Sequence, residues 1–284
     1  MKVKMKDLLL FASLACHLST NAQEYQLVWS DEFDGNGVLD ENKWTYEEGF
    51  VRNHEDQWYQ KENAYRQNGM LVIECDKLDT LRLNPWYDEN SDAWNKRRKH
   101  IRYTSACVTT KDRFSFTYGR MEVKARIPVA YGAWPAIWTL GNQREWPSCG
   151  EIDVMEYYRI DNVSHVLANV AWGNDKRWNA VWNSVKTPYQ HFLDKDSFWH
   201  SSFHVWRLDW DKDAIRIYLD DDLLNETPVK STVNGSIGDN VSPFNFPQYI
   251  LLNLALGGDN GGRIDDKAFP MRYEIDYVRV WQRK

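Results

Sequence analysis

The sequence predicts an all-β protein built as a sandwich of two sheets. From Glu24 onward, short segments rich in β-forming residues alternate with turn residues, and no long stretch has helical periodicity. The number of such segments suits two packed sheets. No change of composition and no Pro/Gly/Ser-rich linker divides the chain from Gln23 to Lys284, so we expect a single domain over residues 23–284.

Each expected strand is a short run of β-branched, aromatic or other apolar residues that ends near turn formers. In chain order the clearest are Gln26–Trp29, Leu71–Cys75, Ser105–Thr109, Gly119–Ile127, Ala136–Leu140, Glu151–Tyr157, Val166–Ala171, His204–Trp210, Ile215–Leu219, Tyr249–Leu256 and Tyr273–Trp281.

Two intervals are expected to be long loops, residues 79–103 and residues 173–203. Loops of this length on a rigid sandwich commonly carry binding residues. Both contain tryptophans, whose flat rings suit the C–H faces of sugars, although an individual Trp more often fills a core or anchors a loop. These tryptophans are Trp86, Trp94, Trp178, Trp182 and Trp199.

Composition excludes several classes of function. Hydrophobic residues make up 43% and charged residues 27% of the 284 residues, which is typical of a globular protein rather than a disordered one. The net charge is −6 without a basic block, so nucleic acid is not an expected partner. No apolar run of about 18 residues follows the N-terminal segment, so no transmembrane span is expected.

Residues 1–22 are expected to be a signal peptide, because a basic start precedes an apolar stretch and the small-residue exit Thr20-Asn21-Ala22. This predicts a secreted or periplasmic protein that begins at Gln23. Lipid attachment at Cys16, giving an outer-surface lipoprotein, is the alternative. Of the other cysteines, Cys75 and Cys107 could form a disulfide, or all could be buried as small apolar residues.

The strongest local signal is a run of three carboxylates, Glu151, Asp153 and Glu156, within one expected strand. In a regular strand the first two share a face and Glu156 points to the other face, beside the core residues Ile152 and Val154. Burying Glu156 there without a partner would cost several kcal/mol. A one-residue β-bulge near Val154 restores the parity and turns all three acids to one face.

On such a strand the Glu151 and Glu156 Cα atoms lie about 13 Å apart. Inward leaning of both side chains brings the carboxyl groups near the roughly 5 to 5.5 Å that retaining glycoside hydrolysis uses. Like charges at this separation raise at least one pKa, and Asp153 between them can hold a proton by hydrogen bonding. A solvated acidic strand or a calcium site would also explain the same spacing.

The acidic run resembles the E-x-D-x-x-E signature of glycoside hydrolase family 16, in its laminarinase-like form with an extra bulge residue. Other stretches agree with the family in order, which makes the resemblance specific over nearly all of residues 23–284. They are Trp29–Asp34, Glu62-Asn63 with Asn68–Leu71, Tyr103–Ala106, Tyr118–Glu122, Ala133–Trp138 and Ile275–Trp281.

The resemblance implies a β-jelly-roll of two curved antiparallel sheets with a concave cleft that cleaves a polysaccharide or oligosaccharide internally. Glu151 matches the nucleophile, Glu156 the general acid and base, and Asp153 the residue that tunes both. The implied sugar-binding residues are Asn63, Trp134 and Trp138, with Trp146 and Trp172 as further candidates and packing as the alternative for Trp172. No cofactor is implied for the chemistry, and a monomer is expected.

Many family members bind one structural calcium ion, and the matching positions here are Glu32, Gly69 and Asp276. Carboxylates near sheet ends are common, so spacing alone does not establish the oxygen ligands that calcium needs.

One departure bears on the substrate. Laminarinase-like members often carry a His on the strand after the catalytic one, where this sequence has Ala171. The expected activity is hydrolysis of a β-1,3 or mixed β-1,3/1,4 glucan. Because the departure removes a polar contact on which β-1,3-glucan specificity would depend, β-galactoside cleavage in a keratan- or mucin-like glycan is the alternative. A carbohydrate-binding protein without turnover is the alternative from another class.

Overall fold

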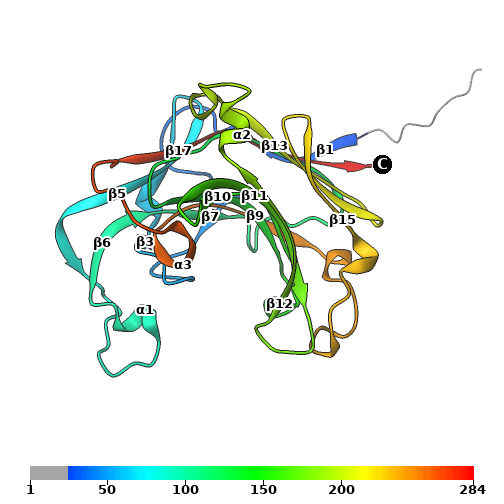
Figure 1. The fold of residues 1–284 in the computed structure, drawn as a ribbon, viewed down its shortest axis with the longest axis horizontal. Coiled ribbons are helices and arrows are strands. Elements are labelled where there is room, and N and C mark those ends of the chain that lie inside the picture. The colour runs from blue at the N-terminus through cyan, green and yellow to red at the C-terminus, as the bar shows by residue number, and fades with distance from the viewer. Residues whose placement is uncertain (1–24) are drawn as a thin grey trace, which may run out of the picture.

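Two antiparallel sheets stack face to face in the computed structural model, which describes residues 25–284 (Figure 1). The expected signal peptide and Cys16 lie outside the described residues. The predicted all-β sandwich of two curved sheets is confirmed. One pairing departs from the antiparallel pattern, because the short strand at Gln57–Tyr59 runs parallel to its neighbour at His100–Ser105.

The outer sheet has ten strands. Its main path runs β15 (Asp222–Pro228), β14 (Ala214–Leu219), β13 (His204–Trp210), β8 (Gly119–Arg126), β17 (Met271–Arg283), β5 (Met70–Leu83), β6 (His100–Ser105) and β3 (Gln57–Tyr59), while β1 (Tyr25–Asp31) pairs with β17 and β4 (Ala64–Gln67) with β5.

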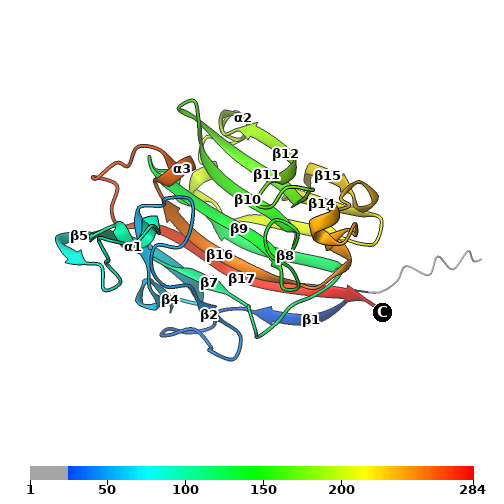
Figure 2. The same ribbon diagram turned by 90° about the horizontal axis from the view of Figure 1, so that it is seen from below.

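The inner sheet has seven strands, which lie side by side in Figure 2. Their order is β12 (Ala180–Pro188), β11 (Val163–Gly173), β10 (Glu151–Ile160), β9 (Ala133–Gly141), β16 (Gln248–Leu256), β7 (Cys107–Thr109) and β2 (Thr45–Tyr46).

Helices are confined to short connections. They are α1 (Trp94–Arg97), α2 (Gln190–Leu193), α3 (Gly258–Gly261) and the 3₁₀ turns Lys61–Asn63, Trp199–Ser201, Val229–Ser231, Ser236–Gly238 and Pro243–Asn245. In the part of the chain described, no helix is long and apolar enough to cross a membrane.

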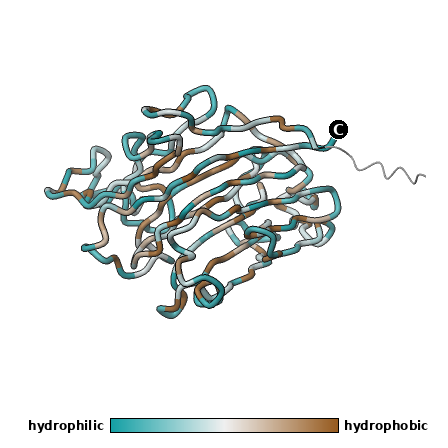
Figure 3. Tube along the Cα trace, turned by 90° about the horizontal axis from the view of Figure 1, so that it is seen from above, coloured by the Kyte–Doolittle hydropathy of each residue, from teal (hydrophilic) through white to brown (hydrophobic). Residues whose placement is uncertain are grey.

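The main core fills the space between the sheets and is built from alternating positions. In β8 the side chains of Met121, Val123 and Ala125 are buried, while those between them are part-exposed. Figure 3 shows this change between apolar and polar residues along the strands. Each fully buried large apolar side chain contributes about 1.5 to 3 kcal/mol to folding, so this alternation fixes which face of each strand is covered.

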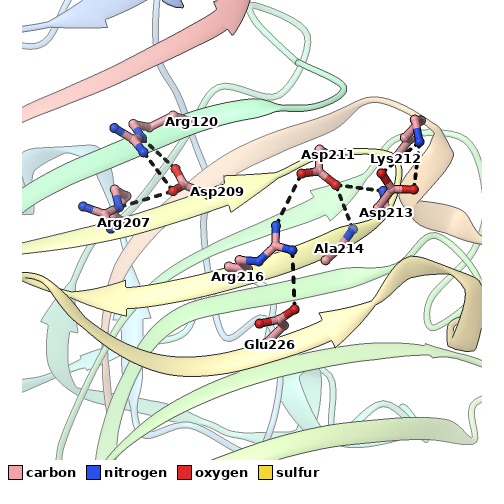
Figure 4. A network of polar contacts seen from close by, with 9 residues as sticks. All are labelled: Arg120, Arg207, Asp209, Asp211, Lys212, Asp213, Ala214, Arg216 and Glu226. Carbon is pink, nitrogen blue, oxygen red and sulfur yellow. Dashed lines mark hydrogen bonds and ion pairs between the residues drawn. The ribbon is translucent and has the colours of Figure 1, made fainter. Parts of the chain in front are cut away.

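The outward face of the outer sheet carries paired charges. Arg120 on β8 donates two hydrogen bonds to Asp209 on β13, at 2.6 and 2.9 Å (Figure 4). Arg216 on β14 pairs with both Asp211 and Glu226, at 3.4 Å each. Such partly exposed pairs stabilise a protein weakly, about 0 to 1 kcal/mol each. Their effect is to keep this face polar.

Both expected long loops contain strands. Residues 79–83 continue β5, because Arg82 and Leu83 pair with Ile101 and His100, so the connection is limited to residues 84–99. Residues 180–188 form β12, which pairs with β11 along its whole length.

Two further expectations are corrected. The expected strand Ser105–Thr109 is divided at Ala106, where the chain passes from the outer sheet (β6) to the inner sheet (β7). Cys75 and Cys107 do not form a disulfide, because Cys75 packs in the main core and Cys107 in a separate cluster around Trp138. Together with Cys149 they are free and buried, as the alternative expectation held.

Candidate active site

The predicted bulge is present in β10 and is confirmed by the register of both neighbouring strands. Asp153 pairs with Asn169 and Glu156 with Leu167, so two residues of β10 lie opposite one residue of β11. The register with β9 shifts at the same place. The extra residue lets Val154 and Met155 pack in the main core while all three acids line one cavity on the inner sheet.

Each of the two catalytic glutamates receives a hydrogen bond from a tryptophan indole. Trp146 Nε1 donates to Glu151 Oε2 at 2.6 Å, and Trp134 Nε1 donates to Glu156 Oε1 at 2.8 Å. The Asn169 amide on β11 donates to Glu156 Oε2 at 2.9 Å and to Asp153 Oδ2 at 3.3 Å. These donors fix the carboxylates from three different segments of the chain.

Burial raises the pKa of all three acids, and different neighbours act on each of them. Burial raises the pKa of Glu156 to about 7, opposed by the Trp134 hydrogen bond and increased by the charge of Glu151. Burial also raises the pKa of Glu151, and hydrogen bonds from Asp153 and Trp146 and the charge of Arg52 offset only part of this rise. Burial and the charges of both glutamates raise the pKa of Asp153 well above its usual range.

This arrangement separates an ionised group from a proton donor. Asp153, which keeps its proton, can donate it in a hydrogen bond to Glu151, which stabilises the Glu151 carboxylate. Glu156 retains a proton up to about pH 7. A carboxylate and a carboxylic acid on one face of a cavity are the two groups that glycoside hydrolysis needs.

The cavity has a volume of about 590 Å³, within the usual range for a ligand site. One side is built by Arg52, Asn53, Glu55 and Asn260, and the other by residues of β12. Figure 1 shows the segment around α1 and the loops beside β12 on opposite sides of the concave sheet.

Three of the expected sugar-binding tryptophans line the cavity: Trp134, Trp138 and Trp146. The exposed fractions of Trp134 and Trp138 are only 4% and 7%. The Arg52 guanidinium lies 5.0 Å from the centroid of the Trp138 ring, and Trp138 Nε1 donates to Asn253 Oδ1 at 2.7 Å. Their indole groups are thus engaged with protein partners, and little ring surface remains for a sugar.

Asn63 and Trp172 are not among the residues that line the cavity. The Asn63 amide is buried and donates to Glu74 O at 2.7 Å and to Asp76 Oδ2 at 3.0 Å. Trp172 packs in the main core, as its alternative reading held. Neither residue therefore lies in the cavity wall, and a sugar contact by either one stays a prediction.

The expected calcium ligands have other partners. Arg279 donates two hydrogen bonds to Glu32, at 2.9 and 2.6 Å, which lower the pKa of that carboxyl, and Lys124 pairs with Asp276 at 2.8 Å. Within residues 25–284, no three His, Cys, Asp or Glu side chains gather as a metal site. Because the side chains of Arg279 and Lys124 already pair with these two carboxylates, the expected set of ligands does not fit calcium.

Sequence reasoning missed the β12 wall. Three residues of β12 line the cavity: Trp182, Ser184 and Lys186. Across β11, which lies between the two strands, they are in register with Glu151, Asp153 and Glu156, respectively. Their alternation at every second residue was the available signal. Ala171 lies between Glu151 and Trp182 in this register, and its side chain is fully buried and does not line the cavity.

Comparison with known proteins agrees with this geometry. Residues 51–279 match glycosyl hydrolases family 16. The chain is 33% identical over 277 residues to the β-glucanase of Rhodothermus marinus, covering 93% of this chain and 87% of the relative. The chain spans between 34% and 56% of the length of several other curated relatives that it matches.

Two solved structures are similar over most of the fold. The first structure belongs to work on endo-acting O-glycanases that prominent members of the human gut microbiota express to initiate mucin breakdown. It has a TM-score of 0.79 and 32% sequence identity to this chain, and the match covers 92% of this chain and 91% of that chain. The laminarinase catalytic domain of Thermotoga maritima has a TM-score of 0.73 and 31% identity, covering 92% and 99%. The chain therefore belongs to glycosyl hydrolases family 16 and is a glycoside hydrolase.

Proposed function

We propose that this chain is a retaining endo-β-glycanase that cleaves internal β-1,3 or mixed β-1,3/1,4 linkages of a glucan. The observation that carries the proposal is the bulged strand β10, which places Glu151, Asp153 and Glu156 on one cavity with unequal proton affinities. The similarity to the β-glucanase and the laminarinase supports the substrate class.

In the first step, Glu151 attacks the anomeric carbon, and its carboxylate oxygen forms the glycosyl ester. Glu156 gives its proton to the glycosidic oxygen as the bond to the leaving sugar breaks. In the second step, Glu156, now ionised, takes a proton from water, whose oxygen attacks the same carbon and releases Glu151. Two displacements restore the original anomeric configuration.

Asp153 has no bond-making role in this scheme. Its protonated carboxyl donates to Glu151, which lowers the proton affinity of the nucleophile before attack. Asn169 contacts both Asp153 and Glu156 and orients them relative to each other. We assign both as positioning residues.

A second candidate is cleavage of a β-galactoside in a keratan- or mucin-like glycan. Two observations favour it: Ala171 stands where the laminarinase-like pattern has His, and the chain is similar to the structure from the O-glycanase study. With Ala171 at this position, the strand beside Glu151 lacks the polar contact that the His would supply to a glucan.

The test is release of reducing ends from laminarin, mixed-linkage β-glucan, keratan sulfate and mucin. Products from the glucans support the first candidate, products from the galactose-containing glycans alone support the second, and binding without products supports a non-catalytic role. Glu151→Gln and Glu156→Gln should each lower turnover by orders of magnitude with the fold retained. Near wild-type turnover in either variant would refute the assignment.

We also propose export through residues 1–22 and a monomeric mature protein. N-terminal sequencing of the exported protein should give Gln23 as the first residue. Labelling with a radioactive fatty acid, lost in Cys16→Ser, would instead establish the lipoprotein alternative.

A further inference from the structure

A second depression, of about 170 Å³, adjoins the main cavity beyond the indole of Trp146. Trp146 lines both spaces, so the two lie next to each other at this side chain. The depression is also lined by Trp178, Arg177, Lys176 and Ile237, among others. Trp178 lies in the connection between β11 and β12, and 55% of its surface is exposed.

The connection holds Trp178 in a fixed position. Asn174 Nδ2 donates to Asn179 Oδ1, and its own Oδ1 accepts from the Lys176 amide, both at 2.7 Å. On one side of the ring, the Arg177 guanidinium lies 5.1 Å from the centroid and is itself bound by Glu145 through hydrogen bonds of 3.0 and 2.9 Å.

A second tie fastens this connection to the neighbouring loop. Asp175 Oδ1 accepts hydrogen bonds from the Ser236 amide and hydroxyl, at 2.7 and 2.9 Å. The connection therefore has partners in two other segments, the one that carries Glu145 and the one that carries Ser236. An exposed ring on such a support loses little freedom when it binds a ligand.

The backbone of Trp178 is also unusual. Its φ angle is +63°, in the left-handed region that bulky side chains rarely adopt. The backbone of Trp178 is therefore strained, while its large ring is exposed and contributes nothing to the core. Residues held in this way cluster at ligand-binding sites, where the surrounding contacts maintain the conformation.

We propose that this depression is a distal sugar subsite that binds a pyranose of the same glycan chain whose cleavage occurs in the main cavity. The sugar packs a C–H face on Trp178. Its hydroxyls meet both hydrogen-bond donors, from Lys176 and Arg144, and an acceptor, Asp239, which Arg144 holds at 3.1 Å. The inference rests on the proposed function to the extent that the main cavity binds a glycan.

The subsite predicts a dependence on chain length. A short oligosaccharide that fills only the main cavity does not reach Trp178, whereas a polymer does. Removal of the ring should therefore weaken binding of polymers and leave the hydrolysis of short substrates unchanged.

The experiment compares wild-type protein with Trp178→Ala, Trp178→Phe and Phe198→Ala. Phe198 is a matched control, because it is 71% exposed and lines neither space. Affinity electrophoresis in gels with laminarin, mixed-linkage β-glucan, keratan sulfate or mucin gives the apparent Kd for each polymer. Melting temperatures verify that every variant is folded.

Trp178→Ala should raise the apparent Kd by about tenfold for the polymer that retards the wild type. Trp178→Phe, which keeps an aromatic face, should recover most of the binding, and Phe198→Ala should bind as the wild type does. For enzyme that is active on β-1,3-glucan, kcat/KM should fall for laminariheptaose but not for laminaritriose.

The outcomes separate this inference from the proposed function. If the wild type hydrolyses a polymer and Trp178→Ala binds that polymer equally well, the subsite is refuted and the function stands. If Trp178→Ala loses affinity for a polymer and the wild type hydrolyses none of the four polymers, Trp178 binds a glycan but the proposed function is refuted. Absence of retardation by all four polymers would refute the subsite.

Discussion

The indole of Trp134 opposes the protonation of Glu156, and Trp134→Phe removes its hydrogen bond while keeping most of the aromatic volume. Trp134 Nε1 donates to Glu156 Oε1 at 2.8 Å and so stabilises the ionised carboxylate. Without it, the pKa of Glu156 rises further above about 7, and the acid stays protonated to higher pH. The alkaline limb of the pH profile must therefore move upward.

A hydrogen bond to a charged group contributes about 1.5 to 3 kcal/mol, and one pKa unit corresponds to about 1.4 kcal/mol. The full effect would be about one to two units, and water that reaches the part-exposed carboxylate replaces some of the lost bond. We expect the alkaline limb of kcat/KM to move up by about one pH unit. The assay is kcat/KM against pH on the most active polymer of the panel.

Two matched variants decide whether the reasoning holds. Trp138→Phe removes an indole donor from Asn253 instead of from a carboxylate, so its alkaline limb should stay in place. Trp146→Phe removes the donor to Glu151, so its acidic limb should move to higher pH. An unchanged or lower alkaline limb in Trp134→Phe, or an equal shift in Trp138→Phe, would refute the assignment of Glu156 as the acid.

Three further outcomes follow. The pKa of Glu156 in the folded state is raised from 4.5 to about 7, so its contribution to stability is complete below about pH 4.5 and is lost as pH rises through 7. Between pH 4.5 and pH 8, the free energy of unfolding of Glu156→Gln, measured with urea, should therefore rise by about 1 to 3 kcal/mol relative to that of the wild type. An equal difference between the two proteins at both pH values would contradict this. Asn63→Ala should lower the free energy of unfolding by about 1 to 3 kcal/mol without changing KM, because its amide is bonded within the fold. A rise in KM for this variant would instead support a sugar contact. Asn169→Ala should lower kcat, because its amide contacts Glu156. Added calcium and EDTA should leave the melting temperature unchanged, because Arg279 and Lys124 occupy the candidate carboxylates, and a calcium-dependent rise of several degrees would show that the ion displaces them.

The bulge was predictable because local chemistry leaves few alternatives. Glu156 cannot share a buried face with Ile152, and one extra residue in β10 is the smallest change that removes the conflict. The strands with strong apolar alternation were predictable for the same reason: each has one face that must be covered.

The β12 wall was not predictable in the same way. Val181, Trp182 and Ser184 are all exposed, so β12, at the edge of the sheet, lacks the buried face that identifies a strand in sequence. Its identity comes from pairing with β11, which is a tertiary contact. The position of Arg52 against Trp138 likewise joins segments far apart in sequence.

The residues that the family resemblance indicated around the acids divide into two groups: Trp134, Trp138 and Trp146 line the cavity, whereas Asn63 and Trp172 do not. Asn63 is turned toward Glu74 and Asp76 by neighbouring strands, and Trp172 alternates to the core face of β11. A motif transfers a residue's position along the chain, whereas its partners depend on this chain's own packing.

The assignment of Glu151 as nucleophile is tested most directly by trapping the glycosyl-enzyme. A 2-deoxy-2-fluoro glycoside of the sugar that the panel identifies, with a good leaving group, should label the protein once, and peptide mass spectrometry should place the label on Glu151. A label on Glu156 or Asp153, or release of product with inverted anomeric configuration, would contradict the account.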